Sequence, residues 1–123
     1  MSESQETKNG SLQGLQQALQ EFNHNRDWAQ YHSPRNLAMA ISVEAAELLE
    51  LFLWASDDGP QPPVAGREEQ VWEEVGDVMI TLLNFCAAAG IDPIRAAELK
   101  LMKNKAKYPI EKSKGRLEKH NEL

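Results

Sequence analysis

Hydrophobic residues recur every three or four positions along most of the chain, with polar residues between them. This spacing predicts amphipathic helices. The first predicted helix begins after Ser11, a residue type that often caps helix N-termini, and its apolar positions are Leu12, Leu15, Leu19 and Phe22. Three further helices are expected at about 34–54, 67–89 and 93–107. No segment alternates with the two-residue period of a β-strand, so we expect an all-α protein.

Start and stop signals support these boundaries. Ser33–Pro34 and Asp92–Pro93 each place a capping residue before a proline, which is favoured in the first turn of a helix. Gly90 stands just past the third helix, where glycine commonly ends helices. Residues 56–63 are rich in Asp, Gly and Pro and indicate a loop. Four helices with short connections predict a bundle of the four-helix type.

The chain is long enough for one domain, and its ends differ from its middle. Residues 1–10 lack an apolar pattern and are expected to form a flexible leader. The domain is expected at 11–109, with a charged tail at 110–123.

With 13 basic and 19 acidic residues the net charge is −6, which argues against nucleic acid or an anionic membrane as a partner. Cys86, the single cysteine, fits a reducing cytosol. No apolar run reaches the length that a membrane span needs, because Glu44, Glu47 and Glu50 interrupt the best candidate.

Two of the predicted helices carry acidic pairs at a spacing of three. Glu44 and Glu47 lie on the second helix, and Glu74 and Asp77 on the third. Residues three apart share one face of a helix, so each pair can present two carboxylates to one point. On a helical wheel Glu44 falls in the middle of an apolar stripe, and Glu74 does the same on its own helix.

Carboxylates on apolar stripes are costly unless they are paired or bind a metal ion. The pattern therefore favours a shared cation site over ordinary solvated acids, which remain the alternative. Oxygen ligands favour a hard cation, so we expect Mg²⁺, with Mn²⁺ as a second choice. A di-iron bundle would need Glu-x-x-His on two helices, and only Glu21 and His24 have that spacing.

An ordered set of motifs resembles the MazG-like family of all-α nucleoside triphosphate pyrophosphohydrolases, in particular its members that act on dCTP. The similarity extends from about residue 15 to residue 109. It is strongest in these segments: Arg26-Asp27-Trp28, His32-x-Pro34-Arg35-Asn36-Leu37, Glu44-x-x-Glu47-Leu48-x-Glu50-Leu51-Phe52-x-Trp54, Glu73-Glu74-x-x-Asp77-Val78 and Asn104-x-x-Lys107-Tyr108-Pro109.

The resemblance implies Mg²⁺-dependent hydrolysis of a triphosphate, with dCTP or a related pyrimidine deoxynucleotide expected, to the monophosphate and pyrophosphate. It implies that the metal ligands and catalytic acids are Glu44, Glu47, Glu74 and Asp77. It also implies a base pocket and contacts to phosphate, sugar or base, to which we assign Trp28, His32, Trp54, Lys100, Asn104, Lys107 and Tyr108. The chain departs from the dCTP-hydrolysing members at Leu19 and Thr81, where they carry a histidine and a tyrosine.

The predicted helix at 34–54 is apolar over much of its circumference, more than one four-helix unit can cover. We therefore expect a homo-oligomer, with a tetramer favoured over a dimer. Two alternative functions stay open at this point. One is a broader house-cleaning hydrolysis of non-standard triphosphates, and the other is a noncatalytic bundle that senses a nucleotide or binds a protein partner.

Overall fold

The computed structural model describes residues 10–54 and 66–122. Its elements are α1 (Leu12–Asn25), the short 3₁₀ helix η2 (Ala29–Tyr31), α2 (Pro34–Glu50), α3 (Glu68–Ala89), α4 (Pro93–Lys107), α5 (Ile110–Ser113) and the 3₁₀ helix η3 (His120–Glu122). These two ranges contain no strand, which confirms the all-α prediction. Most of the predicted leader and the predicted loop at 56–63 lie outside the described residues.

The helices begin where the capping signals predict. Ser11 Oγ accepts a hydrogen bond from the Gly14 N–H at 2.9 Å. Ser33 Oγ accepts one from the Asn36 N–H at 3.1 Å, and the Asp92 carboxylate accepts from the first turn of α4. Each bond satisfies a backbone donor that the helix itself leaves without a partner.

The predicted end of the second helix is four residues too late. α2 ends at Glu50, and residues 51–54 form turns instead of a further helical turn. The Phe52 N–H bonds to the Leu49 carbonyl, three residues back, so the ladder tightens there. Trp54 then has a φ of 67°, in the left-handed region, which cannot continue a right-handed helix.

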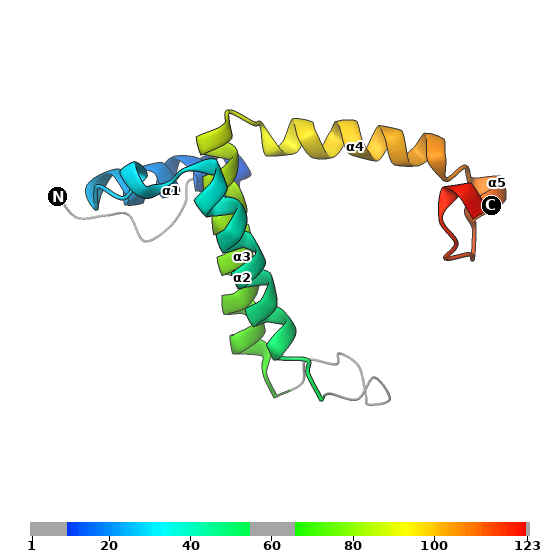
Figure 1. Ribbon diagram of the computed structural model, residues 1–123, viewed down its shortest axis with the longest axis horizontal. Coiled ribbons are helices and arrows are strands. Elements are labelled where there is room, and N and C mark those ends of the chain that lie inside the picture. Colours follow the sequence, from blue (N-terminus) through cyan, green and yellow to red (C-terminus); the bar gives the residue numbers. More distant parts are fainter. Residues whose placement is uncertain (1–9, 55–65, 123) are drawn as a thin grey trace. The chain divides into compact units, whose positions relative to one another are not determined.

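Contacts divide the chain into two compact units, and the boundary along the sequence falls between Gly90 and Ile91. In the first unit α2 and α3 run side by side in opposite directions, and α1 crosses the end where α2 begins and α3 ends (Figure 1). The Asn23 side chain of α1 donates to Asn84 of α3 at 2.9 Å. At the other end, the Arg67 guanidinium donates to the Leu51 carbonyl. The first contact joins α1 to α3, and the second joins the end of α2 to the start of α3.

The apolar core of one chain is small. Among the described residues only Leu37, Leu83 and Cys86 are buried apolar side chains. Large apolar side chains remain exposed on the outer faces of α2 and α3, and Trp72 is 80% exposed. Exposed apolar surface of this kind usually marks an interaction site.

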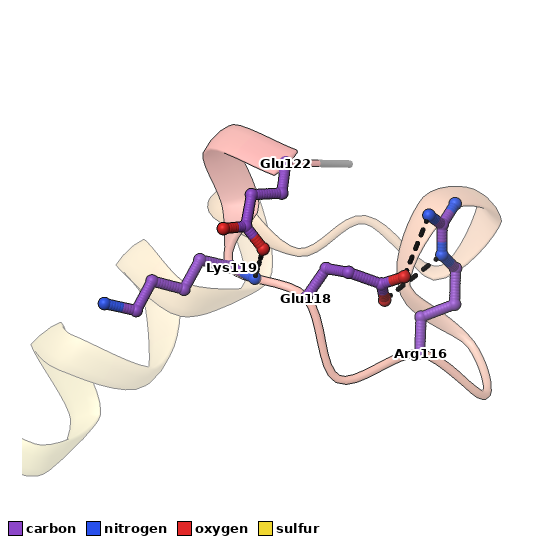
Figure 2. Close-up of polar contacts among 4 residues, drawn as sticks. All are labelled: Arg116, Glu118, Lys119 and Glu122. Carbon is purple, nitrogen blue, oxygen red and sulfur yellow. Dashed lines mark hydrogen bonds and ion pairs between the residues drawn. The ribbon is translucent and has the colours of Figure 1, made fainter.

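The second unit contains α4, α5 and η3. Local contacts hold the segment after α4. The rings of Tyr108 and His120 pack edge-on with their centroids 5.9 Å apart. Arg116 Nη2 forms an ion pair with Glu118 Oε1 at 3.1 Å (Figure 2). The predicted tail, 110–123, thus includes two short helical segments. Within the described parts of the chain no single helix is long and apolar enough to span a membrane, although α3 and α4 would pass together as a bent pair by length and composition.

Candidate active site

Four carboxylates converge between the two long helices. Glu44 and Glu47 come from α2, and Glu74 and Asp77 come from α3. One oxygen of each of the four side chains lies within 4.8 Å of the corresponding oxygens of the others. The spacing of three puts each pair on one helical face, and the packing of α2 against α3 turns the two faces toward each other.

The cluster is partly removed from solvent. Asp77 is exposed, whereas the other three acids are half-buried. One carboxylate oxygen of Glu44 and one of Glu74 are buried without any hydrogen-bond partner. A buried oxygen without a donor is unfavourable, because it has lost its water and gained nothing in return. Two such atoms beside two further carboxylates fit a site that a cation completes, and four oxygen donors suit Mg²⁺ or Mn²⁺ better than Zn²⁺.

The electrostatics of the cluster agree with its burial. Burial raises the pKa of Glu44 above its usual value, and the neighbouring charges of Glu47 and Asp77 raise it further. The pKa of Glu74 is raised for the same reasons, with burial again the main cause. Like charges at short range disfavour ionisation of each acid. A bound divalent cation would reverse this effect, since it favours the ionised carboxylates.

The two candidate tryptophans lie at opposite ends of α2. Trp28 precedes the helix and packs edge-on against Phe22, with ring centroids 5.6 Å apart. Trp54 follows the helix and is fully exposed. The 17 residues of α2 separate them by about 25 Å along the helix axis. One chain therefore does not bring both indoles to one base.

His32, the third base-pocket candidate, lines a cavity of about 250 Å³ where α1, η2 and α3 meet. Gln20, Asn23 and Asn84 also line it, and sequence reasoning did not single them out. A signal for Asn84 was present, because it is the one polar residue in the run from Leu82 to Ala89 of α3. Its contact with Asn23 spans 61 positions, and the helical period contains no information on such a pairing.

The remaining candidates belong to the second unit. Lys100, Asn104 and Lys107 lie on α4 at spacings of four and three, and Tyr108 is its C-cap residue. The two lysines are exposed and Asn104 is half-buried. Because these spacings bring side chains to one side of a helix, the three residues share one face of α4. Tyr108 is held by its contact with His120.

Comparisons with known proteins agree with this architecture. The sequence profile of the MazG-like family matches residues 39–123. The rat protein dCTP pyrophosphatase 1 (Rattus norvegicus) is 37% identical over 115 residues, which cover 92% of this chain and 68% of the relative. The human dCTP pyrophosphatase 1 (Homo sapiens) is 35% identical over the same shares.

A solved structure is also similar. The crystal structure of a pyrophosphatase from Archaeoglobus fulgidus aligns with a TM-score of 0.76 and 42% sequence identity, and the alignment covers 86% of this chain and 99% of the archaeal one. The relatives are enzymes, which favours the catalytic alternative over a noncatalytic bundle. The chain belongs to the MazG-like family, and it is a nucleoside triphosphate pyrophosphohydrolase.

Proposed function

We propose that the substrate is dCTP, or a closely related pyrimidine deoxynucleoside triphosphate, and that hydrolysis to the monophosphate and pyrophosphate depends on Mg²⁺. The observation that carries the metal dependence is the four-carboxylate cluster with its two unpartnered buried oxygens. The choice of dCTP is supported by the names of the rat and human relatives.

The carboxylates have a role that their charge makes necessary. A triphosphate carries about four negative charges, and an acidic cleft without a cation would repel it. We assign Glu44, Glu47, Glu74 and Asp77 as the residues that hold the ion. When bound, a divalent ion neutralises phosphate charge and makes phosphorus more susceptible to attack by water. The carboxylates also fix the position of the reacting end of the substrate.

The contacts to the rest of the nucleotide are part of the same proposal. Lys100 and Lys107 would bind phosphate oxygens, and Asn104 and Tyr108 would contact the sugar or the base. Trp28 and Trp54 would stack on the base, and His32 would shape the pocket. Stacking does not distinguish one base from another, so base selection must come from hydrogen bonds to the base edge.

We further propose that the protein acts as a homo-oligomer, with a tetramer favoured over a dimer, in the cytoplasm. The exposed apolar side chains of α2 and α3 support an oligomer. The distance between the two tryptophans also supports an oligomer. One chain can bring only one of the two indoles to a given base, and a second copy can supply the other.

A panel of triphosphates tests the substrate. The protein is incubated with Mg²⁺ and each of dCTP, dTTP, dUTP, dATP and dGTP, and pyrophosphate release is measured. We expect the highest kcat/KM for dCTP and no release when EDTA replaces Mg²⁺. Similar values for all five would favour the broader house-cleaning activity and contradict the assignment of dCTP.

A further inference from the structure

The cavity between α1, η2 and α3 contains polar groups that the catalytic cluster does not use. Its volume is about 250 Å³. Five of its lining side chains can form hydrogen bonds, and the others are alanines from η2 and α3. The hydrogen-bonding side chains are Gln20, Asn23, His24, His32 and Asn84. A cavity with apolar walls and a few converging polar groups is typical of a small-molecule binding site.

Asn23 and Asn84 form a fixed pair in this cavity. Asn23 is buried, and its Nδ2 donates to Asn84 Oδ1 at 2.9 Å. The backbone of Asn23 is fixed as well, because its carbonyl accepts from the Trp28 N–H at 3.0 Å. Two amides that share one hydrogen bond keep one further carbonyl oxygen and one further NH₂ group for a ligand. The pair therefore offers an acceptor beside a donor.

This pair lies in line with the carboxylates. Asp77, Thr81 and Asn84 follow one another on α3 at spacings of four and three, so they share one face of the helix. The Thr81 hydroxyl donates to the Asp77 carbonyl at 2.8 Å and is held against the helix. Seven residues separate Asp77 from Asn84, which corresponds to about 10 Å along the axis. A sugar and its ester linkage can span that distance between a reacting phosphate and a base.

We infer that the Asn23–Asn84 amide pair binds the base edge of the pyrimidine triphosphate and so determines base preference. The inference rests on the proposed function and names the residues that select its substrate. The edge of cytosine presents its amino group as a donor beside a ring acceptor, and the pair offers the complementary acceptor and donor. Uracil and thymine present the reverse arrangement, a carbonyl acceptor beside a ring N–H donor, which the fixed pair does not match.

The test compares base preference in the wild type and in the double variant Asn23→Ala/Asn84→Ala. The double change removes both partners, so that neither amide is left buried alone. We expect the ratio of kcat/KM for dCTP to kcat/KM for dUTP to fall at least about 10-fold, mainly through a higher KM for dCTP, because a bidentate contact to a base contributes discrimination of this order. Asn25→Ala is the matched control: Asn25 is an exposed asparagine of the same helix outside the cavity lining, and the ratio should not change.

A second measurement does not require turnover. In NMR spectra of the full-length wild-type protein, deoxycytidine should shift the side-chain amide signals of Asn23 and Asn84 and leave that of Asn25 in place. Unshifted Asn23 and Asn84 signals at high deoxycytidine concentration would overturn the inference, even if the double variant failed to fold.

The two proposals fail in different ways. A wild-type enzyme that does not prefer dCTP contradicts the proposed function and the role of the pair in it. A wild-type enzyme that prefers dCTP, together with a folded double variant of unchanged preference, contradicts the role of the pair alone. In that case the amides only join α1 to α3, and the variant should lose stability without a change in the kcat/KM ratio.

Discussion

At the scale of single residues, burial and charge conflict most strongly at Glu44 and Glu74. Each has one carboxylate oxygen that is buried and unpartnered, and each faces further acids across the α2–α3 contact. Glu50, on the same helix as Glu44, is exposed and outside the cluster. Residues of the same type thus have different environments within two helical turns, and their substitutions should have different effects.

Neutral isosteres in the cluster should abolish activity while the fold persists. We expect Glu44→Gln, Glu47→Gln, Glu74→Gln and Asp77→Asn each to lower kcat/KM by at least about 100-fold, the order of loss seen when one group that contributes to stabilising transition-state charge is removed. Pyrophosphate release measures activity, and circular dichroism checks the fold. Glu50→Gln is the matched control and should retain most of the activity. If it were as damaging as Glu47→Gln, the assignment of helical faces would be wrong.

The raised pKa values of Glu44 and Glu74 predict how the stability of the metal-free protein depends on pH. An acid whose pKa is higher in the folded state than in the unfolded chain favours folding when it is protonated. That contribution is fully present below the unfolded pKa, which is about 4.3, and is lost as the pH rises through the higher folded pKa.

The measurement is the Tm in EDTA of the wild type and of Glu44→Gln/Glu74→Gln, from about pH 4 to pH 7. The variant lacks both titrating groups, so its Tm should rise relative to the wild type as the pH increases. Added Mg²⁺ should stabilise the wild type at pH 7 and have little effect on the variant. A Tm difference that did not depend on pH would contradict the unfavourable ionisation of these two acids.

At the scale of helices and turns, most boundaries follow from local chemistry that the sequence displays. Ser11, Ser33 and Asp92 each accept a backbone hydrogen bond at the helix start where they were predicted. Gly90 has the left-handed φ of 69° that commonly ends a helix, which a side chain would disfavour. These features depend on residues that are close along the chain, and periodicity with capping preferences is sufficient to predict them.

The boundary that the sequence does not predict is the end of α2. Leu51 to Trp54 continue the apolar pattern of the helix, but the backbone turns at these residues and Trp54 adopts a positive φ. At this turn the Arg67 guanidinium contacts the Leu51 carbonyl, 16 positions away in the sequence. The spacing of hydrophobic residues gives no information on a contact between residues so far apart in the sequence. The Asn23–Asn84 contact is equally absent from the local pattern. The acidic pairs could be predicted because the two members of each pair are three residues apart, within one helical turn.

At the scale of the whole molecule, the first unit has more apolar surface than one chain covers. Trp72, Val75, Met79 and Leu82 recur along α3 at spacings of three and four, and all are at least 44% exposed. Met39 and Val43 extend exposed apolar surface onto α2, each at 57% exposure. A second copy of the chain would bury these side chains, which is the physical reason to expect a homo-oligomer.

Light scattering after size exclusion measures the mass of the assembly. We expect the mass of a tetramer for the wild type and a smaller species for Trp72→Glu/Met79→Glu, because charge cannot be buried in an apolar contact without a partner. Gln70→Glu is the control: it adds an acid to an exposed position of α3 outside this stripe, and the mass should stay unchanged. A wild type that eluted as a monomer would contradict the proposed assembly.

The central proposal is that the four-carboxylate site hydrolyses dCTP to dCMP and pyrophosphate, and we expect water to attack the α-phosphorus, as the resemblance to the MazG-like family implies. Hydrolysis with Mg²⁺ in ¹⁸O-labelled water, followed by mass spectrometry of the products, tests it most directly. Attack at the α-phosphorus places one ¹⁸O atom in dCMP and none in pyrophosphate, and Glu44→Gln should form neither product. Label in orthophosphate, with dCDP as the second product, would mean attack at the γ-phosphorus and would contradict the claim.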